Sequence, residues 1–420
     1  MKRITKTAVF SLLLILSLIA PFVLQETKEV KAASDAATKK TVRAATEKQL
    51  KAALKNPDVS TVVFRTVSYK DITIKSSKAR KKKIIIDAPN AVITNTAKFK
   101  KVEVIKAKKY IEAVSGNTIK LSSGAYMLVG EGVKVKKLVS TEAPVYYDIR
   151  KNGSINSIKI ADKTHKSTFD KETRTLTFDT VGIWTSYDAD YYGTTENLVT
   201  EEYPIHYTMV LDESGRIFRS SYTGWATELR DENKYDENGN RIEWKQYDAG
   251  SGDLELTGYY DYVYEDYKVV EEIDHAFAPT VVTYKNVYDK DGRLTEAHNS
   301  SQYFSEDISY SYDDNGLMIY EETTKMWFSA DGSLSSRKSW NITYTFDKNG
   351  FLLSKEEYLI DDHLKRISTY EYDKVHNMVH ETHISKTLIG DLTESMDTEY
   401  GLRYEYDELG METKVLTEMP

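Results

Sequence analysis

The sequence predicts an all-β protein whose two halves are built on different patterns. In the first half, short apolar runs recur at intervals of roughly ten residues between Val62 and Leu121, and no helical pattern separates them. In the second half, from about residue 205, strands of alternating apolar and polar residues end in turns that contain Asp and Gly. The first pattern predicts short parallel rungs stacked like a β-helix, and the second predicts an antiparallel β-meander.

A short capping helix is expected in front of the rungs. Thr46 and Gln49 have the spacing of a capping box, in which each side chain accepts a hydrogen bond from the other residue's backbone amide. Leu50 and Leu54 then lie one turn apart on one face, and Pro57 ends the helix.

This region, over about residues 46–123, resembles the N-terminal cap and first coils of right-handed parallel β-helix proteins of the pectate-lyase-like type. The spacing and composition of the short strands carry the resemblance. Enzymes of that family use acidic calcium ligands and a basic catalytic residue on one face. No matching Asp cluster stands out in this sequence, so the resemblance implies the fold and no activity.

The clearest unit of the second half is residues 339–353, SWNITYTFDKNGFLL. Trp340, Ile342, Tyr344 and Phe346 alternate with small polar residues, which places the four large side chains on one face of a strand. In the DKNG that follows, the Asp can bond the backbone two residues on, and the Gly can adopt positive φ. We therefore expect a type I turn with a bulge, followed by a return strand.

The same turn recurs through the second half. Turns that keep both the Asp and the Gly are 211–215, 235–239, 288–292, 312–316, 346–350 and 406–410. Residues 372–376 form a version without the Gly, and residues 264–266 form a weaker remnant. Aromatic residues that enter neighbouring strands in register would form rows across the sheet.

The aromatic-Asp-x-x-Gly-x-aliphatic pattern resembles that of the YD-repeat proteins, the Rhs and wall-associated protein family of bacteria, over about residues 205–413. Long arrays in that family form a spiralling β-sheet shell around a secreted cargo. This array is far too short for such a shell, and it lacks the core-associated protease motif and the variable C-terminal toxin. The resemblance therefore implies the sheet and not toxin delivery.

Residues 1–33 have the features of an export signal. Basic residues precede the apolar run 8–24, and small residues favour cleavage near Ala32 or Ala33. The alternative is an uncleaved membrane anchor, because about seventeen apolar residues lie near the lower limit for a span. No Cys is available for lipidation or disulfides, and no later transmembrane run follows. We expect a secreted, extracellular protein of the kind exported by Gram-positive bacteria, associated with the cell surface.

The mature chain is divided by charge. Residues 34–137 contain 24 Lys and Arg against 8 Asp and Glu, whereas residues 138–420 carry a net charge of about −27. Such opposite charges indicate two modules with different partners, or two modules attracted to each other.

Residues 138–204 are predicted to form a connecting β module and a linker between the basic module and the repeat array at 205–420. The sequence around Lys151, Asn152 and Gly153 predicts a hairpin. The polar, Tyr-rich segment 186–197 is interpreted as the linker.

The densest basic run is the candidate site. It consists of Lys78, Arg80, Lys81, Lys82 and Lys83. One interpretation is contact with a polyanion such as an anionic cell-wall polymer or an acidic polysaccharide. The alternative is a solvated loop between rungs that discourages edge pairing.

The sequence contains no recognisable catalytic, metal or cofactor site. The Asp-x-Asn-Gly turns lead into strands and not into a twelve-residue calcium loop. His376 and His380 share a strand face that His383 does not share. Acidic residues are too frequent for a glycosidase pair to be nominated. Four tryptophans are candidate sugar platforms, Trp225, Trp244, Trp327 and Trp340, although Trp340 has the parity of the buried face.

These observations predict a secreted, non-catalytic repeat protein that acts as a binding or scaffold module at the bacterial cell surface. The expected partners are an anionic wall polymer or polysaccharide, or another protein, and nucleic acid is not expected. One alternative is an extracellular polysaccharide lyase or hydrolase on the β-helix portion. A further alternative is a fragment of a YD-repeat toxin-delivery system.

Overall fold

The computed structural model describes residues 40–122, 125–141, 145–161, 167–189, 196–224, 228–249, 253–277, 280–389 and 393–418. The predicted export signal lies outside these residues. The described chain is all-β apart from one α-helix and one 3-10 turn, and it contains the two kinds of β structure that the sequence predicts.

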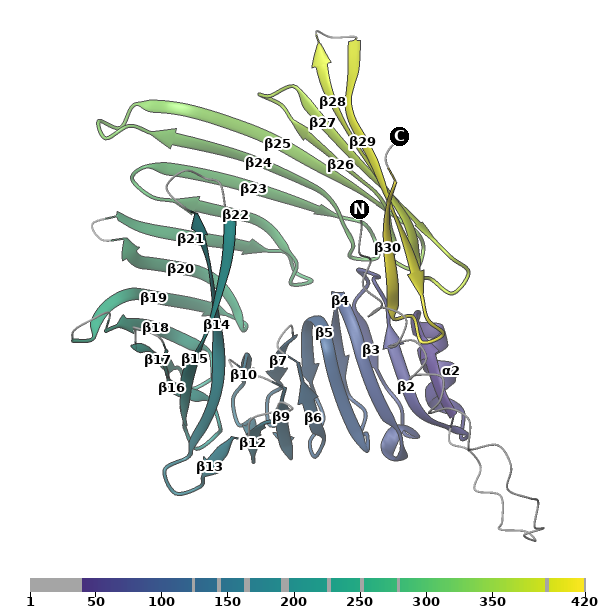
Figure 1. The fold of residues 1–420 in the computed structure, drawn as a ribbon, viewed down its shortest axis with the longest axis vertical. Helices are drawn as coiled ribbons and strands as arrows, with labels where there is room; N and C mark the ends of the chain where they lie inside the picture. Colours follow the sequence, from purple (N-terminus) through teal and green to yellow (C-terminus); the bar gives the residue numbers. More distant parts are fainter. Residues whose placement is uncertain are drawn as a thin grey trace, which may run out of the picture. The chain divides into compact units, whose positions relative to one another are not determined.

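The first part is a parallel β-solenoid. Strands β2 (Val59–Arg65), β4 (Lys83–Asn95), β5 (Lys101–Glu112), β6 (Thr118–Leu121), β9 (Lys137–Ser140) and β12 (Ile158–Ile160) pair in this order (Figure 1). The remaining strands are β1 (Lys40–Ala44), β3 (Ile72–Ile74), β7 (Ala125–Val129), β8 (Lys134–Val135), β10 (Tyr147–Ile149) and β11 (Ser154–Ile155). All of these pairings are parallel.

The predicted capping helix is confirmed as α2 (Glu47–Lys55). The Thr46 hydroxyl accepts a hydrogen bond from the Gln49 amide at 3.3 Å, and Gln49 Oε1 accepts one from the Thr46 amide at 3.1 Å. Leu50 and Leu54 are buried. The helix therefore covers the first rungs with its apolar face, while its polar cap satisfies backbone amides that would otherwise lack partners.

The core of the solenoid is a column of aliphatic side chains, one from each rung. Its members are Val62, Ile84, Val102, Ile119, Leu138 and Ile158, all in register and nearly fully buried. Burial of each such side chain contributes roughly 1.5–3 kcal/mol. Since successive residues of a strand point to opposite faces, the neighbours of this column point outward.

A polar network is buried beside this apolar column. The Glu112 carboxylate accepts hydrogen bonds from the Tyr110 hydroxyl at 2.7 Å and from the side-chain amides of Asn95 and Asn117 at 3.2 Å. Burial raises the pKa of Glu112 to about 7, although these hydrogen bonds act in the opposite direction. The solenoid therefore contains a carboxyl group that titrates near neutral pH.

The solenoid rungs continue to Ile160, beyond the predicted boundary at residue 137. The predicted hairpin at 151–153 is wrong, because β10 pairs with β7 and β12 pairs with β9, both in parallel. Asn152 does adopt positive φ, at 56°. The sequence therefore predicts the position of a turn correctly, but this turn connects two strands of the solenoid that do not pair with each other.

The second part is one sheet of 18 strands, β13 to β30, in which each strand pairs with its neighbours in the sequence (Figure 1). The first nine are β13 (Thr168–Asp170), β14 (Thr175–Ala189), β15 (Glu196–Leu211), β16 (Ile217–Thr223), β17 (Glu228–Tyr235), β18 (Arg241–Asp248), β19 (Glu255–Glu265), β20 (Lys268–Phe277) and β21 (Thr280–Tyr288). The others are β22 (Leu294–Ser300), β23 (Phe304–Tyr312), β24 (Met318–Phe328), β25 (Leu334–Phe346), β26 (Leu352–Leu359), β27 (Leu364–Tyr372), β28 (Met378–Ile389), β29 (Thr393–Tyr406) and β30 (Glu412–Glu418). The antiparallel meander is confirmed.

The predicted linker at 186–197 is wrong where the structure describes it. Its first residues lie in β14 and its last in β15, and the two strands pair there, with Ser186 opposite Val199. Polar, Tyr-rich composition was mistaken for a loop signal, whereas strand pairing tolerates it. Residues 190–195 lie outside the described residues.

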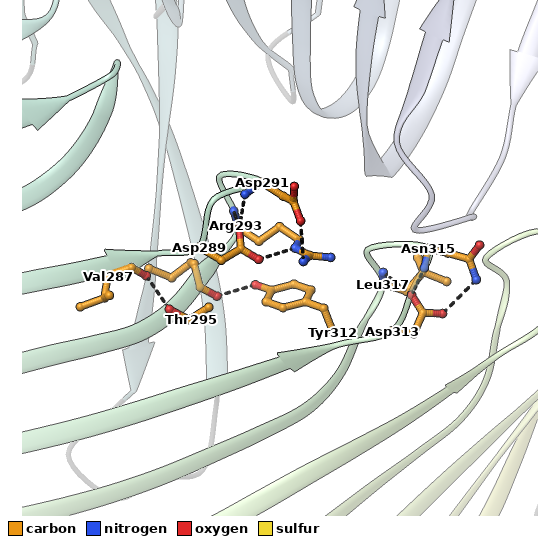
Figure 2. A network of polar contacts seen from close by, with 10 residues as sticks. Val287, Asp289, Asp291, Arg293, Thr295, Tyr312, Asp313, Asn315 and Leu317 are labelled. Atoms are coloured by element: carbon orange, nitrogen blue, oxygen red, sulfur yellow. Dashed lines mark hydrogen bonds and ion pairs between the residues drawn. The ribbon is translucent and has the colours of Figure 1, made fainter.

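The bulged turns of the repeat are confirmed. Gly239, Gly316 and Gly350 have φ of 82°, 81° and 83°, and His376 takes the equivalent position with φ 66° in the turn without Gly. Figure 2 shows two of these turns, in which Asp289 and Asp313 accept hydrogen bonds from backbone amides two and four residues on. The short Asp side chain therefore closes the turn locally.

The weaker remnant at 264–266 is a different turn. Glu265 pairs with Lys268, and the two residues between them, Asp266 and Tyr267, have φ of 45° and 64°. Two positive φ values in a two-residue loop define a type I′ hairpin. This turn therefore replaces the bulged turn of the other repeats.

The turns of the sheet contact loops of the solenoid. The amide of Tyr69 donates to the carbonyl of Gly350 at 2.9 Å, and the Ser68 hydroxyl donates to the carbonyl of Asn349 at 2.7 Å. Near the other end of the sheet, the amide of Ile155 donates to the carbonyl of Ser214 at 2.9 Å. Hydrogen bonds to backbone carbonyls, donated by backbone amides and by side chains, thus connect the basic part to the acidic part.

Candidate polyanion interface

The structure places the five predicted site residues in different environments. Lys78, Arg80 and Lys81 lie at the 3-10 turn Ala79–Lys81 and are exposed. Lys82 is only 4% exposed, and its ammonium donates to the backbone carbonyls of Asn56 and Val59. Burial lowers the pKa of Lys82, and the charge of Asp58 partly offsets this effect. Lys82 is therefore used to hold the capping helix against the first rungs.

The fifth residue, Lys83, begins a set of lysines that the structure brings together. These lysines lie on the outward face of the solenoid sheet, one on each of the strands β4, β5, β6, β9 and β12. They are Lys83, Lys101, Lys120, Lys137 and Lys159, and we call this set the lysine face.

Strand register shows why these lysines share a surface. Lys83 pairs with Lys101, and Thr118 of the next rung pairs with Lys137. In the adjacent column, Lys120 and Lys159 both pair with Val139, which lies between them. Neighbouring strands are about 4.8 Å apart, so the lysines follow one another at distances of one or two rungs.

One acidic residue lies within the lysine face. Glu103 forms ion pairs with Lys83 at 2.7 Å, Lys120 at 2.8 Å and Lys101 at 4.0 Å. Burial alone would raise the pKa of Glu103, but hydrogen bonds and charge from Lys120 and Lys83 outweigh it and lower the pKa to about 2. Glu103 therefore stays ionised and orders three lysines, while the face keeps an excess of positive charge.

A cavity of about 400 Å³ lies at the end of the lysine face. Its basic lining residues are Lys137, Lys159, Lys171 and Arg174, accompanied by Ser157 and Phe169, and no carboxylate of the described residues lines it. Arg174 has φ 53° and donates from Nε to the carbonyl of Asp212 at 2.7 Å, so the turn between β15 and β16 holds its side chain. Among the residues that the structure describes, Lys137 and Lys159 have no carboxylate partner. Four cations thus converge on one pocket, and none of them forms an ion pair with a carboxylate among the described residues.

Sequence reasoning found only the start of this surface. The run at 78–83 is conspicuous because its charges are consecutive, whereas the later lysines are separated by other residues. A signal was nevertheless present, since a lysine at an outward position recurs at intervals of roughly twenty residues, the length of one solenoid turn. Lys171 and Arg174 flank a turn of the sheet, and their place beside the last rungs depends on tertiary structure.

The sequence predicts no metal site and no membrane-spanning segment after the export signal. His380 and His383 lie in β28 and His376 lies in the turn before it. Within the described ranges, no group of three or more His, Asp or Glu residues is arranged to hold a metal ion. No helix in the same ranges is long and apolar enough to cross a membrane.

Comparison with known proteins gives only weak likenesses among solved structures. No family model matches the sequence, and no curated protein matches it. Among solved structures, a porin-like protein from Bacteroides uniformis ATCC 8492 is 10% identical, with 53% of this chain and 93% of that chain covered. The TM-score is 0.25, so this likeness carries no argument about fold or function. The similarities to YD-repeat and pectate-lyase-like proteins remain resemblances of sequence pattern.

Proposed function

We propose that this protein is a secreted, non-catalytic binding protein of the bacterial cell surface that holds an anionic cell-wall polymer on its lysine face. The observation that carries the proposal is the set of five lysines on neighbouring strands, which ends in a cavity lined by four basic residues and, in the described part of the chain, by no carboxylate. A linear polyanion can contact such a set at several points at once, and its binding releases the counterions of each neutralised group.

The arrangement favours an external polyanion over attraction between the two halves. The ion pairs of Lys83, Lys101 and Lys120 are made with Glu103 of the solenoid itself. The contacts of the solenoid with the turns at Gly350 and Ser214 include backbone hydrogen bonds, which need no net charge. Arg43 and Arg65, which donate to turn carbonyls of the sheet, do not belong to the lysine face. The positive charge of the lysine face is therefore available to a partner outside the chain.

The test is binding of the full chain to purified teichoic acid over a range of NaCl concentrations. We expect binding at low salt with a steep, linear fall of log affinity against log salt concentration. A variant carrying Lys137→Gln, Lys159→Gln, Lys171→Gln and Arg174→Gln should bind more weakly and show a shallower salt slope.

The matched control removes the same charge from the sheet. Lys290, Lys348, Lys374 and Lys414 are exposed, and their replacement by Gln changes the net charge equally. We expect this control to bind nearly as the natural chain does. Equal losses in the two variants would show that only total charge matters, and no binding of the natural chain at low salt would remove the proposal.

A further inference from the structure

A second cavity, of about 610 Å³, lies over one face of the sheet between β14 and β19. Its volume is in the range of small-molecule sites. Five aromatic side chains line it, from Tyr146, Tyr207, Tyr222, Trp244 and Tyr262. We call this cavity the aromatic cleft. It does not share any lining residue with the basic cavity at the lysine face.

Strand pairing places these side chains on a common face. Tyr207 of β15 lies opposite Tyr222 of β16. Trp244 of β18 lies opposite Asn233 on one side and Tyr260 on the other, and Tyr262 follows two residues later on the same face. Tyr146, which precedes β10 of the solenoid, adds one further ring and is 54% exposed.

The polar groups of the cleft combine hydrogen-bond acceptors with donors. Asp231 accepts hydrogen bonds from Ser220 at 3.2 Å and Gln246 at 3.3 Å, which leaves further acceptor capacity on its two oxygens. Arg241 lies 5.2 Å from the ring centre of Tyr262 and donates a long hydrogen bond of 3.5 Å to Asn233. The guanidinium also hydrogen-bonds Tyr262, and those of its five N–H donors that Asn233 and Tyr262 do not use can bond another partner.

The charges of the cleft are balanced. Among the residues that the structure describes, Asp231 is the only carboxylate and Arg241 the only basic side chain that line it. Burial raises the pKa of Asp231, and the charge of Arg241 is one of the effects that act against this rise. A purely apolar ligand would desolvate both groups without meeting their remaining hydrogen-bonding capacity, which is costly. A polyanion would be repelled by the carboxylate of Asp231. The lining therefore suits an uncharged ligand that has both apolar faces and many hydroxyl groups.

Neutral sugars have this chemistry, because the C–H groups of a pyranose ring form an apolar face and vicinal hydroxyls both donate and accept hydrogen bonds. We propose that the aromatic cleft binds a neutral oligosaccharide, with its rings stacked on Trp244 and the neighbouring tyrosines and its hydroxyls bonded to Asp231, Asn233 and Arg241. This site is separate from the lysine face and does not depend on the function proposed for it.

The test is isothermal titration calorimetry of the full chain against four neutral hexasaccharides: cellohexaose, maltohexaose, mannohexaose and N-acetylchitohexaose. We expect at least one to bind, and we expect its affinity to be unchanged between 0.05 and about 0.5 M NaCl, because no net charge is neutralised. Trp244→Ala should lower that affinity by about tenfold or more, as expected for the loss of a stacking ring, and Trp244→Phe should restore part of it.

Two further variants serve as controls for the place of binding. Tyr146→Ala changes an exposed ring outside the sheet, so the fold should persist while the affinity falls. Trp327→Ala removes a tryptophan of β24 that does not line the cleft, and it should leave binding intact. Failure of all four sugars to bind would overturn the proposal. So would binding that survives both Trp244→Ala and Tyr146→Ala, or binding that disappears with salt and with the four lysine-face substitutions.

Discussion

The amide of Tyr69 donates a hydrogen bond to the carbonyl oxygen of Gly350 at 2.9 Å, and this bond joins a loop of the solenoid to the turn between β25 and β26. A Cβ atom on Gly350 would lie 2.9 Å from the Ser68 hydroxyl and from the Lys70 Cβ. Glycine is thus required at position 350 for two reasons. The backbone there has positive φ, and the solenoid leaves no room for a Cβ atom.

These two requirements can be separated by experiment. Gly332 has φ of +82°, like the +83° of Gly350, but no atom lies within 4 Å of its ideal Cβ position. Gly332→Ala should cost about 1 kcal/mol through backbone strain alone, and Gly350→Ala should cost about 1–3 kcal/mol more through overlap. The measurement is the midpoint of urea unfolding. Equal midpoints for the two variants would mean that the turn does not contact the solenoid closely.

The aromatic face of the repeat should contribute to stability. Tyr344 is partly buried, and its ring stacks on that of Phe346 with centroids 6.4 Å apart. Tyr344→Ser should lower the free energy of unfolding by about 1–3 kcal/mol, because the ring loses its buried contacts. Thr343→Ser, at the exposed neighbouring position, should have little effect. An unchanged midpoint for Tyr344→Ser would contradict burial of this face.

The buried carboxyl group of Glu112 predicts a dependence of stability on pH. Its folded pKa of about 7 lies above its ordinary value of 4.5, so between these pH values the folded chain binds more protons than the unfolded chain. The free energy of unfolding should therefore fall as pH rises from 4.5 to 7. Glu112→Gln should flatten this part of the profile, as measured by urea unfolding at several pH values. A natural chain with no such fall would refute the role of Glu112.

Glu103 predicts the opposite dependence at lower pH. Its folded pKa of about 2 lies below its ordinary value of 4.5, so its contribution is fully present above pH 4.5 and is lost as pH falls toward 2. Glu103→Gln should reduce stability at neutral pH and remove this acid-side loss. Glu112→Gln is the internal control, since it should leave the acid side unchanged. The two variants should therefore alter different parts of one profile.

Local signals predicted local structure well. The capping box of Thr46, the alternation at 340–346 and the positive φ of Gly350 each depend on neighbouring residues, and each is confirmed. The turn at Asn152 marks the limit of such signals. A short polar turn fixes where the chain bends, but only the packing of the whole rung decides which strand pairs with which.

The same limit applies to the two sites. Lys83 was found because it belongs to a dense run, but Lys159 joins it only through the register of five strands. Trp244 was named as a platform from its type alone. Its partners Tyr207 and Asp231 come from strands whose pairing the sequence pattern did not specify in detail.

The hydrogen bond between Ser68 and Asn349 joins residues 281 positions apart, and that between Arg65 and Leu409 joins residues 344 apart. Ribosomes release a chain from its N-terminus, so the loops after β2 emerge long before the turns that will cover them. The rungs of the solenoid, which pair with close neighbours in sequence, can form early, whereas these contacts must wait for the last strands. The C-terminal strands are therefore the last part needed to complete the folded structure. In a chain that ends before β25, the ring of Tyr69 would lack its contact with Phe346.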